Sequence, residues 1–211
     1  MPCSEFVLEH YSVPIFQISY VLKHEDVIFL NKNTYLEEKA VNLCRIEPTH
    51  RVLEVGFGLG IGLTSACRYV EANKGKVYGI DISDKIISTA KQTLQVEIRE
   101  GKLHIQKGCV SLLPFENDTF DRVFHCNCFH FWPDLLICCR ELYRVLKPNS
   151  FMVTTLCIKS IKHAREKGLL QYGPQDHLVF IETLEKASFK DVMLDTFEEN
   201  GKKFEAIIAF T

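Results

Sequence analysis

The side chains of this chain best suited to chemistry stand at the ends of short apolar segments. Glu54 comes directly before a turn with glycine at every second position, Gly56, Gly58 and Gly60. Asp81 ends the next apolar segment. A carboxylate accepts hydrogen bonds from hydroxyl and ammonium groups, and glycines, which lack a Cβ, let a ligand lie directly against the backbone. We therefore expect a nucleotide-like cofactor to bind at this turn.

A third candidate follows a later apolar segment, in the sequence NCFHFW from Asn127 to Trp132. His130 in this sequence can accept a proton near neutral pH, which makes it the candidate general base. A histidine packed among its aromatic neighbours would give the same pattern. Those aromatic side chains could face a substrate, attract a cation or belong to the core. His125 alternates along the preceding segment and is expected to be structural.

These residues need a sheet of parallel strands, buried on both faces, to position them. Apolar segments alternate with amphipathic ones, which is typical of a doubly wound α/β fold. The expected strands are 52–55, 76–81, 103–108, 122–127 and 151–157, and the expected helices are 34–45, 61–70, 85–98, 134–146 and a last one after Asp176 through Ala187. Residues 158–175 are polar and predict a loop. Asn200-Gly201 between the alternating segments 189–197 and 203–210 predicts a hairpin.

The glycine spacing narrows the choice of cofactor. A dinucleotide-binding turn has the pattern G-x-G-x-x-G, and the third glycine would fall at Ile61 or Leu63, neither of which is glycine. No Gly-Lys-Ser/Thr follows for a P-loop. Asp81 at the end of the second strand can accept hydrogen bonds from both hydroxyls of a ribose. Its alternative role is a helix N-cap, for which Ser83 is the better candidate.

Several segments in the right order resemble the class I S-adenosylmethionine-dependent methyltransferases. EVGFGLG, starting at Glu54, resembles the signature E/D-x-G-x-G-x-G of that superfamily. The segment from Gly108 to Asp121 resembles G-D-A-x-x-L-P-F followed by an acidic turn and F-D, and LKPNS, ending at Ser150, resembles L-K-P-G-G. Cys109 departs from the pattern, because the family usually has an aspartate there that contacts adenine, and a thiol is a poor acceptor.

The resemblance implies a fold and a set of roles. The fold is a Rossmann-like, seven-stranded, mostly parallel sheet with helices on both faces and a C-terminal antiparallel hairpin. The implied cofactor is S-adenosyl-L-methionine, whose methionine and ribose portions would approach the backbone of Gly56, Gly58 and Gly60. Its ribose would bind Asp81, and its adenine would pack on Ile82 and be lined by the backbone at Cys109 and Val110. Its ammonium group would face the Asn127 carbonyl and Glu54, unless Glu54 only braces the turn. The set looks most like the small-molecule branch that includes the ubiquinone- and menaquinone-biosynthesis enzymes.

Length and composition agree with a single methyltransferase domain over residues 1–211. The chain has 211 residues, 46% of them hydrophobic, which suits one core and not two. We expect residues 1–33 to form an N-terminal cap or lid and residues 34–211 to form the cofactor-binding core. Nine cysteines without a C-x-x-C pair indicate free thiols and a reducing compartment, the cytoplasm, and no metal site.

The expected acceptor is a small molecule. The net charge of −2 and the dispersed basic residues disfavour nucleic acid as a partner, and no segment has the length of a membrane span. The N/D-P-P-Y/F motif of methyltransferases that act on nucleic acid amino groups is also missing after Asn127. Two alternatives stay open: a catalytically weak or inactive protein of this fold that serves as a binding partner or subunit, and a nicotinamide-dependent oxidoreductase, which the glycine spacing opposes.

Overall fold

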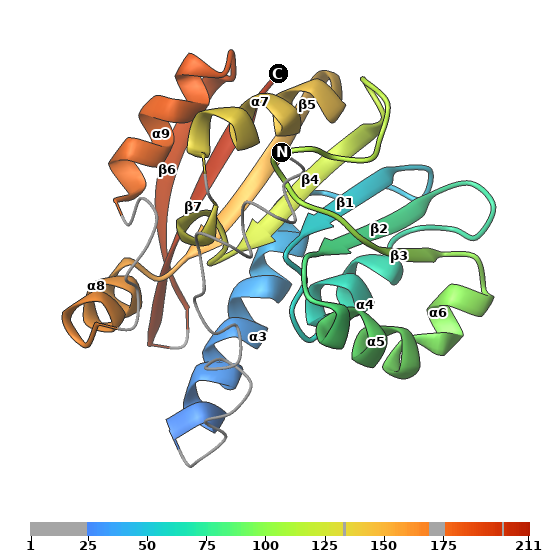
Figure 1. The fold of residues 1–211 in the computed structure, drawn as a ribbon, viewed down its shortest axis with the longest axis horizontal. Helices are drawn as coiled ribbons and strands as arrows, with labels where there is room; N and C mark the ends of the chain where they lie inside the picture. The colour runs from blue at the N-terminus through green and yellow to red at the C-terminus, as the bar shows by residue number, and fades with distance from the viewer. Residues whose placement is uncertain (1–24, 133, 169–175, 200) are drawn as a thin grey trace.

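The computed structural model describes residues 25–132, 134–168, 176–199 and 201–211, with side chains from residue 34 onward. Figure 1 shows an open sheet with helices on both of its faces. The helices are α3 (Glu25–Leu43), α4 (Ile61–Cys67), α5 (Asp84–Thr93), α6 (Gln95–Arg99), the short 3-10 helix η1 (Phe129–Phe131), α7 (Leu135–Val145), α8 (Ile158–Glu166) and α9 (His177–Lys186). The strands are β1 (Arg51–Val55), β2 (Lys76–Asp81), β3 (Leu103–Lys107), β4 (Phe120–Cys126), β5 (Leu146–Leu156), β6 (Lys190–Glu199) and β7 (Lys202–Phe210).

The strands form one seven-stranded sheet in the order β3-β2-β1-β4-β5-β7-β6. The first five are parallel, and β7 lies antiparallel between β5 and β6. The sequence prediction of the sheet and of its C-terminal hairpin is therefore confirmed. The chain moves outward from β1 to β3 and then returns to place β4 beside β1. The carboxyl ends of β1 and β4 form the switch point where ligands of such sheets bind.

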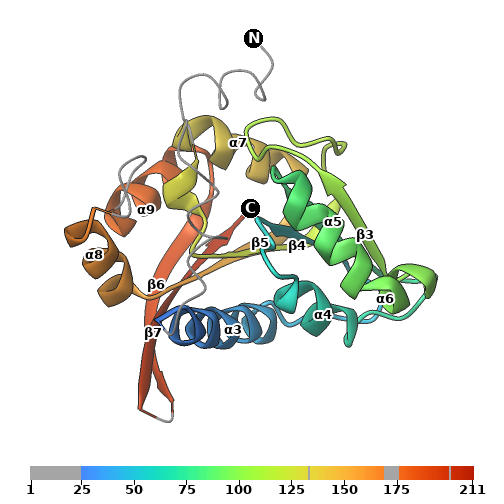
Figure 2. The same ribbon diagram turned by 60° about the horizontal axis from the view of Figure 1, so that its bottom comes forward.

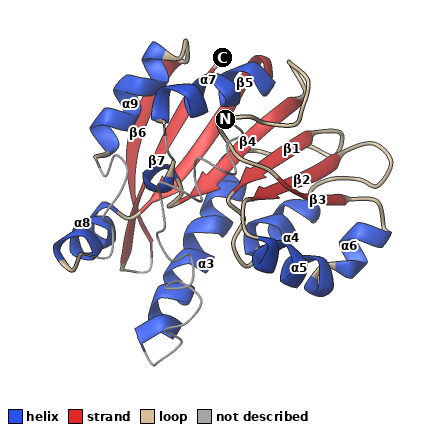
Figure 3. Cartoon of the chain, viewed as in Figure 1, coloured by secondary structure: helices blue, strands red, loops and turns tan. Residues whose placement is uncertain are grey.

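Two apolar layers hold the helices onto the sheet. On one face α3, α4 and α5 bury residues such as Val41, Ala66 and Ile87 against the sheet. On the other face α7 and α9 bury Leu142 and Phe180 against the sheet. Figure 2 shows α3 and α4 side by side on one side of the sheet, with α7 and α9 on the opposite side, and Figure 3 shows how the strands fill the layer between them. The carboxyl ends of the central strands are thus held between two packed layers.

Side-chain caps begin three of the helices where the sequence predicts a start. Ser83 Oγ accepts a hydrogen bond from the amide of Ile86, at 3.4 Å, at the start of α5. The carboxylate of Asp134 accepts the amide of Ile137, at 3.0 Å, at the start of α7. Asp176 does the same for the amide of Leu178, at 2.9 Å, at the start of α9. Each cap satisfies an amide that has no partner inside its helix.

The structure corrects several predicted boundaries. The single helix expected at 85–98 is two helices, because the backbone of the buried Leu94 leaves helical geometry between α5 and α6. Strand β5 begins at Leu146 rather than 151, since Leu146 pairs with Phe120, and Asn149 inside it has a positive φ of 60°. Helix α3 begins at Glu25, earlier than expected.

Part of the polar segment predicted as a loop is also helical. Residues 158–166 form α8, whose Ile158 and Ile161 pack on the core beside α9. The rest of the predicted N-terminal cap, residues 1–24, lies outside the described residues. Within the described ranges, no helix combines the length and the apolar character that crossing a membrane requires.

Candidate functional site

The turn after β1 is built on left-handed backbone. Gly56, Gly58 and Gly60 have φ values of 68°, 51° and 79°, a region that L side chains rarely adopt. The amide of Gly56 donates to the Ile80 carbonyl at 2.8 Å and thereby ties the turn to β2. A Cβ added at Gly58 would meet nothing within 4 Å, so the turn is open there. The open backbone at Gly58 is the surface against which a ligand can lie.

The same turn is closed at Gly56 by a side chain from the loop after β4. A Cβ at Gly56 would lie 2.5 Å from the sulfur of Cys128. The indole nitrogen of Trp132 donates a hydrogen bond to this sulfur at 3.3 Å, and burial raises the pKa of the thiol to about 12. Cys128 therefore stays a neutral thiol and acts as a packing group under the turn.

Asp81 faces the glycine turn, as the sequence predicts for a ribose ligand. Its carboxylate accepts the amide of Ser83 at 2.9 Å, and the amides of Gly58 and Ile82 also face it. Burial raises the pKa of Asp81, and these three amides oppose that shift by stabilising the anion. The next side chain, Ile82, is 42% exposed. The two residues thus form an acceptor and an adjacent apolar surface at the end of β2.

Glu54 is buried beneath the turn, at 1% exposure. It accepts a backbone hydrogen bond from Leu63, and its Oε2 atom has no hydrogen-bond partner among the described residues. Burial raises the pKa of Glu54 well above its ordinary value, and the nearby carboxyls of Glu37 and Asp81 raise it further. An unpartnered oxygen in this position has capacity left for a donor or a cation.

The structure adds a carboxyl that sequence reasoning missed. Glu37 of α3 is 9% exposed, and its Oε2 accepts the amide of Gly62 at 3.0 Å. Burial raises the pKa of Glu37 to about 7, and the Gly62 hydrogen bond opposes that rise. The sequence did carry a signal for this carboxyl, because Glu37 lies between Leu36 and Ala40, on the face of the helix that packs inward. An acidic residue on an apolar helix face needs a partner, and this one finds it in α4.

The loop after β3 carries the residues predicted to line adenine. Cys109 pairs with Leu112 in an isolated bridge, and its sulfur lies 3.1 Å from Ser111 Oγ. Val110 is 6% exposed and packs in the core, whereas Leu112 is 69% exposed. The loop therefore presents backbone and one apolar side chain, but no carboxylate, toward the end of β3.

Asn127 directly follows β4 with a positive φ of 44°, and its amide donates to the Thr155 carbonyl at 3.0 Å. The backbone of Asn127 also hydrogen-bonds to His130. The predicted role of the Asn127 carbonyl in binding an ammonium group would therefore be shared with the imidazole. This conformation turns the chain away from the sheet and into η1.

The candidate base His130 is buried, at 3% exposure. Its ring lies between Phe129 and Phe131, with centroids 5.0 and 4.8 Å away, and Nδ1 has no partner among the described residues. Burial lowers the pKa of His130 to about 4, so the ring is neutral at physiological pH. His125 is fully buried, and its Nε2 lies 2.9 Å from Thr154 Oγ1.

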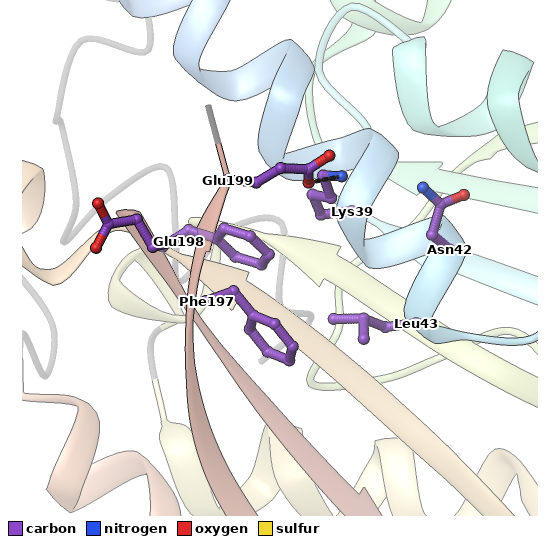
Figure 4. A pocket seen from close by; sticks show the side chains of 7 residues that line it. Lys39, Asn42, Leu43, Phe197, Glu198 and Glu199 are labelled. Carbon is purple, nitrogen blue, oxygen red and sulfur yellow. Dashed lines mark ion pairs between the residues drawn. The ribbon is translucent and has the colours of Figure 1, made fainter. Parts of the chain in front are cut away.

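Most of the predicted cofactor-binding residues gather at the carboxyl ends of β1, β2 and β4. They are the glycine turn, Glu54, Asp81, Ile82 and Asn127. A cavity of about 420 Å³ lies elsewhere, between α3 and the β6–β7 hairpin. Figure 4 shows Lys39 and Glu199 on its rim, where they form an ion pair. Its lining residues come from α3, β6 and β7 and not from the glycine turn. In the described part of the chain, the cysteines are free thiols and no three potential metal ligands cluster.

Comparison with known proteins matches this chain to methyltransferases. Residues 53–154 match the family model described as a methyltransferase domain. Cycloartenol-C-24-methyltransferase 1 of Oryza sativa subsp. japonica is 30% identical over 135 residues, which cover 61% of this chain and 38% of the relative. The 2-phytyl-1,4-naphtoquinone methyltransferase of Trichormus variabilis is 30% identical over 125 residues, which cover 59% of this chain and 54% of the relative.

The chain thus spans roughly a third to a half of these curated relatives. A solved structure described as a SAM-dependent methyltransferase from Aquifex aeolicus has the same fold, with a TM-score of 0.67, 24% identity and coverage of 88% of this chain and 96% of that one. The glycine turn, the match to the family model and the fold together show that residues 53–154 form a methyltransferase domain of the class I S-adenosylmethionine-dependent type.

Proposed function

We propose that this protein is an S-adenosylmethionine-dependent methyltransferase that acts on a small molecule. The main support is one constellation: the open backbone at Gly58, the carboxylate of Asp81 facing it, and the buried, unpartnered oxygen of Glu54. These three groups fit, in turn, a nucleoside, its ribose hydroxyls and an ammonium group. A pyrophosphate would instead meet carboxylates without a cation beside them.

The proposed roles follow from what each residue can do in place. Asp81 would accept hydrogen bonds from the ribose hydroxyls, and Ile82 would pack on the adenine. The backbone at Cys109 and Val110 would line the other side of the base. Glu54 and the Asn127 carbonyl would bind the ammonium group. When bound, S-adenosylmethionine supplies a methyl group activated by the charge on its sulfur.

The chain's own contribution to the reaction is alignment and exclusion of water. Exposed apolar side chains stand on the loops after β1, β2, β3 and β4, namely Leu59, Ile82, Leu112 and Phe131. Such a rim lowers the local dielectric and favours an acceptor with apolar surface. Within this scheme His130 is the proposed general base, with Nδ1 as the atom that takes a proton. Its ring is buried, so a small movement of η1 would have to bring Nδ1 to the acceptor.

The first test is binding of the demethylated product, S-adenosylhomocysteine, measured by calorimetry. We expect saturable binding, and we expect Asp81→Ala to weaken it by about 1.5–3 kcal/mol, roughly 10- to 150-fold, because hydrogen bonds to a charged group are lost. Asp84→Ala is the matched control, since Asp84 is exposed and pairs with Lys107 at the surface. Equal affinity of the Asp81 variant and the wild type would remove Asp81 from the site.

A second function is favoured by two observations: Cys109 replaces the usual adenine-binding aspartate, and His130 is buried. A protein of this fold with weak or absent catalysis could act as the subunit of another enzyme. Product binding without turnover over a broad panel of small acceptors, together with a stable complex with a second methyltransferase subunit, would support this alternative over the first.

A further inference from the structure

Two carboxyl groups from different elements converge on one glycine of α4. Glu37 of α3 accepts the amide of Gly62 at 3.0 Å. The carboxyl of Glu54, at the end of β1, occupies the place where a Cβ of Gly62 would lie, and it accepts a backbone hydrogen bond from Leu63. The first turn of α4 therefore has an acidic side chain on each of two consecutive amides.

The pair is buried, and the described residues place no opposite charge beside it. Glu37 is 9% exposed and Glu54 is 1% exposed. Among the residues that the structure describes, no lysine, arginine or histidine forms an ion pair with either carboxyl. The titratable groups that face the pair are a third acid and thiols, namely Asp81 from β2, Cys44 directly after α3, Cys67 from α4, Cys126 at the end of β4 and Cys128 from the loop after β4.

Two buried carboxylates this close cannot both ionise without a cation, because each pays for desolvation and repels the other. Burial raises the pKa of Glu37 to about 7, and burial together with Glu37 and Asp81 raises the pKa of Glu54. In the absence of a ligand the pair therefore retains a proton to higher pH than exposed carboxyls do.

The location of the pair relates it to the proposed cofactor site. Glu54 directly precedes the glycine turn, and Glu37 faces Cys126, the last residue of β4, so the pair spans the switch point between β1 and β4. The Oε2 atom of Glu54 has no partner among the described residues. Glu37 also stands outside the stretch 53–154 that matches the family, so α3 supplies it from beyond the matched region.

We propose that Glu37 and Glu54 together form the seat for the ammonium group of the cofactor's methionine, and that its binding expels the proton that the two carboxyls share. This inference rests on the proposed function. The ammonium supplies the positive charge that the pair lacks, so the shared proton leaves to solvent as the group binds. Glu37 acts here as a positioning residue, because it sets the charge of the pair through Glu54.

The sign of the resulting pH dependence is fixed. A ligand that prefers the ionised pair binds more tightly as pH rises through the pKa of the pair. With one proton released and a pKa of about 7 for Glu37, affinity should rise roughly 25-fold between about pH 5.5 and about pH 7.5, below the range where an α-amino group loses its own proton.

The experiment is calorimetric titration of the whole protein with S-adenosylhomocysteine across this pH range, in two buffers of different ionisation enthalpy. The wild type should show the rise in affinity and release about one proton per bound molecule near pH 6. Glu37→Gln keeps an acceptor for the Gly62 amide but removes one of the two ionisable groups, while burial still raises the pKa of Glu54. Its affinity should therefore rise less steeply with pH, and its proton release near pH 6 should be clearly lower than that of the wild type. Glu38→Gln, a substitution of the exposed neighbour on α3, should behave as the wild type.

The outcomes separate the two proposals. Binding whose pH dependence is the same in the wild type and in Glu37→Gln would overturn the role of Glu37 and leave the proposed function standing. Absence of binding at every pH, in a protein that melts cooperatively, would overturn the proposed function and the ammonium seat together. A loss of affinity in Glu37→Gln that is equal at all pH values, with proton release unchanged, would assign Glu37 a purely structural role and overturn the coupling.

Discussion

Asp81 and Glu54 differ in how far their hydrogen-bonding capacity is used. Asp81 is faced by three amides, those of Gly58, Ile82 and Ser83, which fix its carboxylate against the glycine turn. Glu54 accepts one amide and keeps an unpartnered oxygen. A carboxylate has about four lone-pair sites, so Asp81 can still accept from hydroxyls while its orientation is held. The turn thus lies beside one preorganised acceptor, Asp81, and one acceptor with an unused oxygen, Glu54.

His130 is the residue whose role separates catalysis from packing. As a neutral ring with an unpartnered Nδ1, it is a base that must move to act. If His130 takes the proton of the methyl acceptor, His130→Asn should lower kcat about 100-fold or more, since general base catalysis contributes roughly 10²–10⁴ to the rate. The affinity for S-adenosylhomocysteine should stay within about twofold of the wild type. Turnover and calorimetry on the same preparation measure both. An unchanged kcat would make His130 a core residue.

At the scale of elements, α7 holds the loop after β3 with one arginine. Arg144 donates to the carbonyls of Leu113 and Phe115, at 3.1 and 2.8 Å, and pairs with Glu141, at 2.7 Å. Glu141 in turn accepts the amide of Leu113 at 2.8 Å. The planar guanidinium reaches these acceptors at once, which an ammonium group does not do. The loop that carries Cys109 and Val110 is therefore fixed by α7 and not by a helix of its own.

We expect Arg144→Lys to destabilise the protein by about 1–3 kcal/mol, because loop carbonyls lose their donors. The same change should weaken S-adenosylhomocysteine binding severalfold, since the loop after β3 would lose its fixed position. Urea denaturation and calorimetry give the two values. Arg140→Lys, an exposed position on the same helix, is the control and should change neither. A stable variant with normal affinity would show that the loop holds itself.

Much of the sheet was predictable because its strands carry strong local signals. The apolar segments before Gly56 and through Asp81, and the Asn-Gly turn near the C-terminus, each specify their element without help from distant residues. The seven-stranded, mostly parallel sheet with its C-terminal antiparallel hairpin followed from the resemblance of successive motifs. In these segments the local propensity, the apolar pattern and the turn residues all favour the element that the structure shows.

Tertiary contacts decided what the sequence did not predict. Leu94 interrupts the helix expected at 85–98, because its buried side chain packs against the turn: a Cβ at Gly60 would lie 2.9 Å from Leu94 Cδ1. Ile158 and Ile161, three residues apart, bury one face of α8 within a segment whose lysines suggested a loop. Glu37 was missed for the same kind of reason, since its partner amide lies 25 positions away along the chain.

At the scale of the whole molecule, buried groups of opposite kinds set the response to acid. Burial lowers the pKa of His125 to about 3 and of His130 to about 4, below the ordinary value of 6.5. The unfolded chain then binds more protons between about pH 6.5 and about pH 4, so these rings reduce stability as pH falls. Glu37, with a pKa raised from 4.5 to about 7, has the opposite effect between those values.

Between about pH 6.5 and about pH 4.5 the raised carboxyl and the lowered imidazoles act in opposite directions, so removal of one imidazole should shift the balance toward higher stability at low pH. His130→Asn removes one of the two imidazole contributions, on the order of 3 kcal/mol at full protonation. Its free energy of unfolding should fall less steeply from pH 6.5 to pH 4 than that of the wild type. Chemical denaturation at a series of pH values measures this slope. His104→Asn, at an exposed position, serves as control, and parallel slopes in all three proteins would contradict the prediction.

The contact between Glu54 and Gly62 ties the size of one residue to the identity of another. The glutamate carboxyl fills the space beside the Gly62 Cα, so a methyl group at position 62 requires either that this carboxyl move or that the acid at position 54 be one methylene shorter. Positions 54 and 62 should therefore change together when such proteins diverge: glutamate accompanies glycine, and aspartate permits alanine. The length of the acidic side chain that reaches the ligand and the shape of the first turn of α4 should then be inherited together.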